Sequence, residues 1–312
     1  MLLSTFLFLL SAQGYAQSLE DFWTDEEPEP AETLEQRFIR TNIAITDWFD
    51  GTAEGLDLFL VGKKVSNRKN NTHLRLGNST FAVDGEGTKN NTSIAIDLRL
   101  PNLEEYWQLQ LSSFDEADEK RSAQQGYVRS TPRETKYGAT MGLFRKLGNI
   151  RTAFQPRLEL TDPLKVSHSL SFESIANFQT YEANPKVEFY ATPDKGTGIY
   201  TAFNWNFIVT KLVSFTLINN WDYQEKIHTL SAGNGFSFGQ AVDRKNSMAY
   251  GLMFFSNNRD NYHLEGYSFS VVWSHLIYRK ILDFQLIPHL DFMKDKDFRG
   301  VPGIIFNLNL NF

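Results

Sequence analysis

The chain has 312 residues, contains no cysteine and carries a formal net charge of −6, with 41% hydrophobic and 22% charged residues. The missing cysteine excludes a disulfide scaffold, a thiolate metal site and a cysteine nucleophile, and the acidic balance argues against a general nucleic-acid binder. The apolar fraction is sufficient for an ordered structure. A total of 26 Phe, 12 Tyr and 6 Trp is high for a soluble domain of average hydropathy.

The first 16 residues predict a targeting segment. Leu2–Leu10 is a predominantly apolar run, and Gly14–Ala16 supplies a small-residue cleavage site before Gln17. The run is too short to span a bilayer as a helix, which takes about 20 apolar residues. We therefore expect a signal peptide at 1–16. No Lys or Arg precedes the run, which leaves the true start codon open.

Residues 17–72 differ from the rest of the chain. Residues 18–35 are acidic and contain proline, which predicts a solvated linker. Between 33 and 61 the apolar residues recur near helical spacing, which predicts one or two short amphipathic helices. The residues that carry this spacing are Leu34, Phe38, Ile43, Ile45, Trp48 and Phe49. The basic and polar segment 62–71 predicts a loop.

From His73 onward the hydrophobic pattern has a period of two, which predicts strands with one apolar and one polar face. The last segment is the clearest, because apolar residues from Ile304 to Phe312 alternate with asparagines. About fourteen strands are predicted, although a count of twelve stays open. In the first strand Leu74 and Phe81 are out of phase, which predicts a β-bulge. The predicted strands are 73–83, 92–100, 106–115, 136–147, 150–161, 166–178, 186–192, 197–210, 212–223, 229–241, 247–257, 263–278, 281–293 and 302–312.

Alternation alone fits either a soluble sandwich or a membrane barrel. Many predicted strands run over ten residues, whereas soluble strands peak near ~5–6 residues and a tilted membrane strand needs ~9–11. Tight turns such as 147–149 alternate with longer polar connections such as 115–135 and 294–300. Aromatic residues gather near strand ends, as in the two girdles of a barrel. These features favour an all-β, antiparallel, up-and-down transmembrane barrel over residues 73–312, whose sheet must close because unpaired edges are costly in lipid.

The chain resembles Gram-negative outer-membrane β-barrel proteins. This class ends in an alternating strand with a terminal aromatic residue that the barrel-assembly machinery reads. Here Phe306, Leu308, Leu310 and Phe312 form the corresponding candidate insertion signal. The resemblance implies location in the bacterial outer membrane, with outer-membrane lipid and the assembly machinery as partners. More narrowly, 267–312 and the sequence Leu98-Arg99-Leu100-Pro101 resemble an uncharacterised proteobacterial outer-membrane family, which implies no function.

The polar face of the predicted barrel gives the candidate lumen lining. Neither sign of charge dominates it, and neither a basic ring nor an apolar lining is evident. The candidate lining residues are Arg75, Asp97, Arg99, Gln108, Gln110, Arg157, Glu159, Glu188, Asn204, Asn206, Asp283, Gln285, His289, Asp291 and Asn307. His289 and Asp291 share this face, and we expect a solvated or paired lining there.

No catalytic constellation, cofactor site or metal site is predicted. Gly235–Gly239 matches GxSxG, but that motif needs a sharp strand-to-helix turn, whereas Phe236 and Phe238 here continue a strand with Ser237 on the lumen side. None of the six His forms HExxH or another close metal pair.

Three functions remain open from the sequence. The leading hypothesis is a porin-like channel for small polar solutes, because the inner face is polar. The alternative is a structural or assembly barrel that acts through 17–72, as a periplasmic contact or a plug with a periplasmic partner. An outer-membrane enzyme is the least favoured hypothesis. No nucleic-acid partner is expected.

Overall fold

The computed structural model describes residues 33–61, 72–99, 107–122, 129, 131–278 and 281–312. The predicted signal peptide and the predicted loop 62–71 lie outside these residues. Helix α2 spans Leu34–Val61 without a break, so the prediction of one or two short helices is corrected to one long helix. Its start is fixed by a capping box, because the Thr33 backbone N–H donates to the Gln36 side chain and the Gln36 N–H donates to Thr33 Oγ1. None of the helices in the described residues is long and apolar enough to cross a bilayer.

All other long elements are strands that follow the predicted alternation. Two short helical elements interrupt them, α3 (Glu116–Arg121) and the 3-10 turn η1 (Lys294–Lys296). The strands are β1 (His73–Val83), β2 (Gly87–Arg99), β3 (Trp107–Ser112), β4 (Gly138–Leu147), β5 (Ile150–Glu159), β6 (Lys165–Ser174), β7 (Ala176–Asn177), β8 (Tyr181–Thr192), β9 (Gly196–Ile208), β10 (Val213–Gln224), β11 (Thr229–Ala241), β12 (Asn246–Asn257), β13 (His263–Tyr278), β14 (Leu282–Met293) and β15 (Gly300–Asn311).

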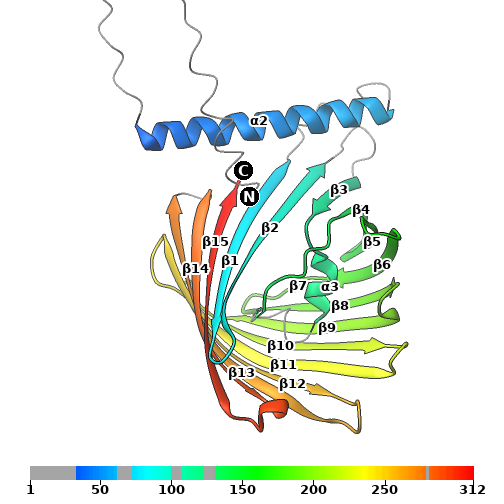
Figure 1. Cartoon of the computed structure of the whole chain (residues 1–312), viewed down its shortest axis with the longest axis vertical. Helices are drawn as coiled ribbons and strands as arrows, with labels where there is room; N and C mark the ends of the chain where they lie inside the picture. The colour runs from blue at the N-terminus through cyan, green and yellow to red at the C-terminus, as the bar shows by residue number, and fades with distance from the viewer. Residues whose placement is uncertain (1–32, 62–71, 100–106, 123–128, 130, 279–280) are drawn as a thin grey trace, which may run out of the picture. The chain divides into compact units, whose positions relative to one another are not determined.

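The strands form one closed antiparallel barrel. Each strand pairs with its neighbours in the chain, β15 pairs with β1, and β6 pairs with β8. The two-residue β7 pairs with β8 just beyond β6, so it extends the β6 position and the described wall holds 14 strands. Figure 1 shows the strands side by side in chain order, with β15 in red beside β1 in cyan. The predicted all-β antiparallel barrel is confirmed, and the higher strand count is the correct one.

The outer face of the wall is apolar and the inner face is polar. In β9 the outward Phe203 and Trp205 are each 39% exposed, while the alternate residues Asn204 and Asn206 point inward. Aromatic contacts run along the outer face from strand to strand, for example from Phe207 in β9 to Phe215 in β10. A wide exposed apolar belt of this kind would be unstable in water and is suited to lipid. The wall is therefore that of an integral membrane barrel.

The predicted bulge in β1 is wrong. Its pairing with β2 and β15 runs without a register shift from one end to the other. The pattern changes phase because Phe81 points into the barrel, where it packs with Ile287 and Ile305. An apolar cluster in the lumen is therefore the physical reason for the irregular alternation.

Two strands begin earlier than predicted. β2 starts at Gly87 rather than 92, and β8 starts at Tyr181 rather than 186, so neither is short. The first residues of β2 escape an alternation analysis because both faces there are polar. On the outer face Asn78 and Asn90 exchange amide hydrogen bonds, and they also donate to Thr92 and Thr80. Polar side chains can occupy this part of the outer wall because they bond to one another.

Candidate functional site

The connection between β3 and β4 is far longer than the other connections in the described wall, and it folds back against the inner face. Its helix α3 starts at the N-cap Asp115, whose side chain accepts a hydrogen bond from the Asp118 N–H at 3.0 Å. Acidic residues occupy the first turn, while Lys120 and Arg121 occupy the last, as the helix dipole favours. The sequence of 115–135 predicts only a polar connection, so helix α3 is a correction.

A buried ion pair ties α3 to β8. Arg121 Nη1 lies 2.6 Å from Glu188 Oε1, and both side chains are almost completely buried. Lys186 Nζ contacts the other carboxylate oxygen of Glu188 at 2.6 Å. The Arg121 guanidinium also stacks over Tyr190, 4.3 Å from the ring centroid. Tyr190 in turn donates to Asp222 at 2.7 Å, so the contact network reaches from the loop to β10.

Further contacts fix the two ends of the loop. Asp118 pairs with Lys195 in the β8–β9 turn. Burial would raise the pKa of the Asp118 carboxyl, but Lys195 and then Arg121 outweigh burial and hold that pKa below its ordinary value of 3.8. On β5 the buried Arg157 donates to Ser112 at 3.0 Å and to the Lys136 carbonyl at 2.7 Å. These bonds bring the start and the end of the loop to the same point on the wall.

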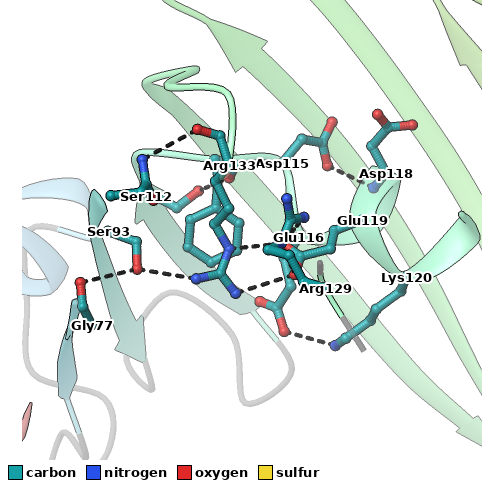
Figure 2. Close-up of polar contacts among 12 residues, drawn as sticks. Gly77, Ser93, Ser112, Asp115, Glu116, Asp118, Glu119, Lys120, Arg129 and Arg133 are labelled. Atoms are coloured by element: carbon teal, nitrogen blue, oxygen red, sulfur yellow. Dashed lines mark hydrogen bonds and ion pairs between the residues drawn. The ribbon is translucent and has the colours of Figure 1, made fainter. Parts of the chain in front are cut away.

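Two arginines from the later part of the loop converge on one carboxylate (Figure 2). Arg129 and Arg133 each contact Glu119 through two nitrogens, at 2.9 to 3.1 Å. Arg133 also donates to Ser93 of β2 at 3.2 Å and lies over the Phe114 ring at 4.3 Å. The loop is thus fastened to β2, β3, β5 and β8, and it narrows the lumen from within.

Cavities lie on either side of this loop. One of about 310 Å³ is lined by α3 and the inner faces of β2–β6 and β8, including Arg121, Arg157 and Glu188. A second of about 280 Å³ lies between Arg129 and Arg133 and the strands β1, β13, β14 and β15. A third cavity of about 430 Å³ lies beside the β9–β10 turn. This turn is at the same end of the barrel as the start of β1 and the end of β15. Val272 lines both the second and the third cavity, so the two adjoin along the same wall.

The strand register places the predicted lining residues on one face of the wall. Asp97, Gln108, Gln110, Arg157 and Glu188 meet at the first cavity, and Gln285 and Asn307 meet at the second. Other predicted lining residues occupy inner positions beside single partners: Arg75 opposite Asn311, Glu159 opposite Lys165, Asn204 with the Asn219 N–H, Asn206 with Thr216, and Asp283 with Asn309 and Asn311. Arg99 pairs in register with Gln108, but its side chain lies outside the described part. A role of these residues in solute passage stays a prediction.

His289 and Asp291 come together with two serines, but the group is not a catalytic triad. His289 Nδ1 lies 3.1 Å from Asp291, and Ser268 donates to the same carboxylate. Ser270 is directly opposite His289 in the register. The imidazole, however, leans over Gly303, because a Cβ built there would lie 2.4 Å from Nε2. The nitrogen that would activate Ser270 thus faces the neighbouring strand on the other side.

The remaining sequence motifs occupy ordinary positions in the wall. Gly235–Gly239 lies inside β11, which continues to Ala241 and leads to β12 rather than to a helix. Among the described residues no group of three or more His, Asp or Glu is arranged to hold a metal ion. In β15 the apolar Phe306, Leu308 and Leu310 share the outer face, and the Phe312 N–H bonds to the Leu74 carbonyl. Recognition of this strand by the assembly machinery stays a prediction.

Four residues of the loop that make these contacts are not predicted from the sequence: Glu119, Arg121, Arg129 and Arg133. The only available signal was the density of opposite charges in 115–135. Such a segment is usually a solvated surface loop, and alternation says nothing about which way it folds.

Comparison with solved structures identifies the fold. The barrel resembles OmpF of Salmonella typhi, solved in complex with daunomycin, with a TM-score of 0.50, 6% sequence identity, and coverage of 80% of this chain and all of that one. It also resembles the channel DcaP of Acinetobacter baumannii (0.47, 8%, 80% and 99%) and KdgM porin (0.39, 7%, 76% and 99%). No family model and no curated protein sequence matches the chain. The fold is that of the outer-membrane β-barrels, and its apolar outer wall is suited to the bacterial outer membrane.

Proposed function

We propose that this protein is a porin-like channel that lets small polar solutes cross the outer membrane passively. The observation that carries the proposal is the pair of adjoining lumen cavities, of about 280 and 430 Å³, on the side of the loop away from α3. A barrel of 14 strands is wider than the small barrels that side chains alone can fill. The inner wall of β10–β13 carries small residues such as Ser214, Gly239 and Ser274, which leave space for a solute.

The loop between β3 and β4 sets the width of this route. Its ion pairs with β8 and its bonds to β5 hold it against one side of the lumen. The cavities of about 280 and 430 Å³ lie on the opposite side of the lumen, along β10 to β15. Selection among solutes would then depend on the loop side chains that face these cavities, because they are the charged groups at the narrowing.

Single-channel recording in a planar bilayer tests this function. The purified protein without residues 1–16 is refolded, and closure of the barrel is checked by its resistance to unfolding in detergent. Discrete current steps are expected from wild type, and larger steps from a variant in which residues 116–134 are replaced by a short glycine–serine linker. A correctly folded barrel that gives no steps, with the loop or without it, contradicts the proposal.

A second candidate function is an assembly or structural role for the segment 17–72, placed in the periplasm. The described helix α2 favours it, because Leu34, Ile43 and Trp48 are 84%, 53% and 65% exposed and offer apolar surface to a partner. Two experiments test it: deletion of 17–72, and in-cell crosslinking from position 48 of the chain that retains the segment. A barrel that inserts normally without the segment and no crosslinked partner would remove this candidate. Membership of the narrower proteobacterial outer-membrane family is also a proposal, supported by the resemblance of 267–312 and of Leu98-Arg99-Leu100-Pro101.

A further inference from the structure

The cavity beneath Arg129 and Arg133 has an unusual combination of lining groups. Its volume of about 280 Å³ corresponds to roughly nine waters at ~30 Å³ each. It is therefore large enough for a solute of about a dozen non-hydrogen atoms. Two arginines from the loop line it together with Ser79, three amide side chains and three apolar side chains from the wall.

The charge that faces this cavity is positive. Both guanidinium groups bind the single carboxylate of Glu119, so the three side chains together retain one positive charge. Glu119 does not line the cavity, whereas Arg129 and Arg133 do. Within the described residues, the other side chains of the lining are uncharged. An anion in the cavity would therefore meet guanidinium groups without meeting their counter-charge directly.

The opposite wall suits hydroxyl groups and C–H surfaces. Gln285, Asn307 and Asn309 present amides, each of which can donate and accept hydrogen bonds. Beside them Phe81, Val272 and Ile287 form an apolar surface that belongs to the lumen cluster described above. Guanidinium groups, amides and an apolar floor in one cavity match a molecule that has a carboxylate, several hydroxyls and a carbon skeleton.

We infer that this cavity is a binding site for small hydroxylated carboxylates. The inference rests on the proposed channel function, because the cavity lies on the proposed route. The carboxylate binds Arg129 and Arg133, the hydroxyls bond to the three amides, and the carbon chain lies against Phe81 and Ile287. The site makes the channel selective for such anions over neutral polyols of the same size.

Equilibrium binding tests the site without relying on conductance. Gluconate and sorbitol are a matched pair, since they differ only in a carboxylate in place of a terminal CH₂OH. Calorimetric titration of the folded full-length barrel in detergent should give an affinity for gluconate about tenfold higher than for sorbitol. Arg129→Gln should remove most of this preference and leave sorbitol binding unchanged. Lys120→Gln is the matched control, because it removes a positive charge on the α3 side of the loop, away from this cavity.

Glu119→Gln provides a variant with the opposite expected effect. It removes the counter-charge of two guanidinium groups, so gluconate should bind several-fold more tightly than to wild type. Equal affinities for gluconate and sorbitol, or an equal loss in Arg129→Gln and Lys120→Gln, would overturn the inference. Heat resistance of the folded barrel, measured for every variant, ensures that only closed barrels are compared.

Bilayer recordings on the same preparations separate this inference from the proposed function. Gluconate binding by a barrel that never conducts would refute the channel and keep the site. Conductance without any preference for gluconate would keep the channel and refute the site. In a conducting barrel, gluconate should reduce the wild-type current in a concentration-dependent manner, and Arg129→Gln should weaken that block about tenfold.

Discussion

Arg121 of α3 and Glu188 of β8 form an ion pair of 2.6 Å in which neither side chain is appreciably exposed to solvent. The pair joins a loop to a strand that lies 67 positions further along the chain. Because both charges are desolvated, removal of Glu188 would leave the buried Arg121 without its closest counter-charge, whereas removal of Arg121 would leave Glu188 paired with Lys186. The attachment of the loop to the wall therefore depends strongly on this contact.

Loss of either partner should release the loop. Glu188→Gln is expected to cost about 3–5 kcal/mol of loop docking, and Arg121→Gln less, because Lys186 still pairs with Glu188. In both variants the single-channel conductance should rise. The double variant should be less destabilised than the sum of the two singles, because both substitutions remove the same contact. Thermal unfolding of the refolded barrel, combined with conductance, measures both effects. Strict additivity of the two substitutions would show that they do not act through a shared contact.

Acid should release the loop only at low pH. The pKa of Asp118 is held below its ordinary value of 3.8, chiefly by Lys195 against the effect of burial. A carboxyl with a depressed pKa stabilises the docked loop fully above 3.8 and loses this contribution as the pH falls through its folded-state value. Conductance should therefore be constant from pH 7 to about pH 4 and increase below it. Lys195→Gln should move the transition to higher pH, and an unchanged transition would contradict the assignment to Asp118.

The two faces of β11 should respond differently to the same charge. Phe236 is 41% exposed on the outer face, and Ser237 next to it points into the barrel. Phe236→Arg is expected to destabilise the barrel by about 2–4 kcal/mol, because an arginine near the middle of the lipid face is costly. Ser237→Arg should cost much less. Urea titration of the barrel folded into vesicles compares them, and equal losses would contradict the assigned faces.

A glycine on β9 makes room for the tyrosine in the loop network. A Cβ at Gly198 would lie 2.3 Å from the Tyr190 ring and 2.6 Å from the Tyr223 carbonyl. Gly198→Ala should displace Tyr190 from Asp222 and cost about 1–3 kcal/mol. Gly239→Ala is the matched control, because its only close neighbour is the Ser214 hydroxyl at 2.9 Å, which can rotate away. Thermal unfolding of both variants should show a clear loss for the first and little change for the second.

The barrel itself could be predicted because lipid and lumen impose opposite polarity on alternate residues. The pattern from Ile304 to Asn311 carries this information directly, and the predicted 263–278 coincides with β13. Alternation gives a wrong prediction where an inward residue is apolar or an outward residue is polar. Phe81 is apolar on the inner face, which suggested a bulge, and Asn90 is polar on the outer face, which hid the start of β2.

The candidate site could not be predicted to the same extent. The wall residues of the site, such as Arg157 and Glu188, follow from alternation. Their partners do not, because Arg121 and Asp118 lie in a segment without periodicity, and their contacts join positions far apart in the chain. Charge density showed that the loop is polar, but the contacts that turn it inward depend on the closed barrel around it.

The pairing of β1 with β15 has a consequence for the assembly of the barrel in the membrane. Arg75 lies beside Asn311, so the first and the last strands of the wall complete each other's hydrogen bonds. Until β15 has been synthesised, one edge of β1 and one edge of β14 remain unpaired, and unpaired edges are costly in lipid. Biogenesis should therefore be all-or-none: a chain that lacks β15 would be degraded rather than inserted as a smaller cylinder.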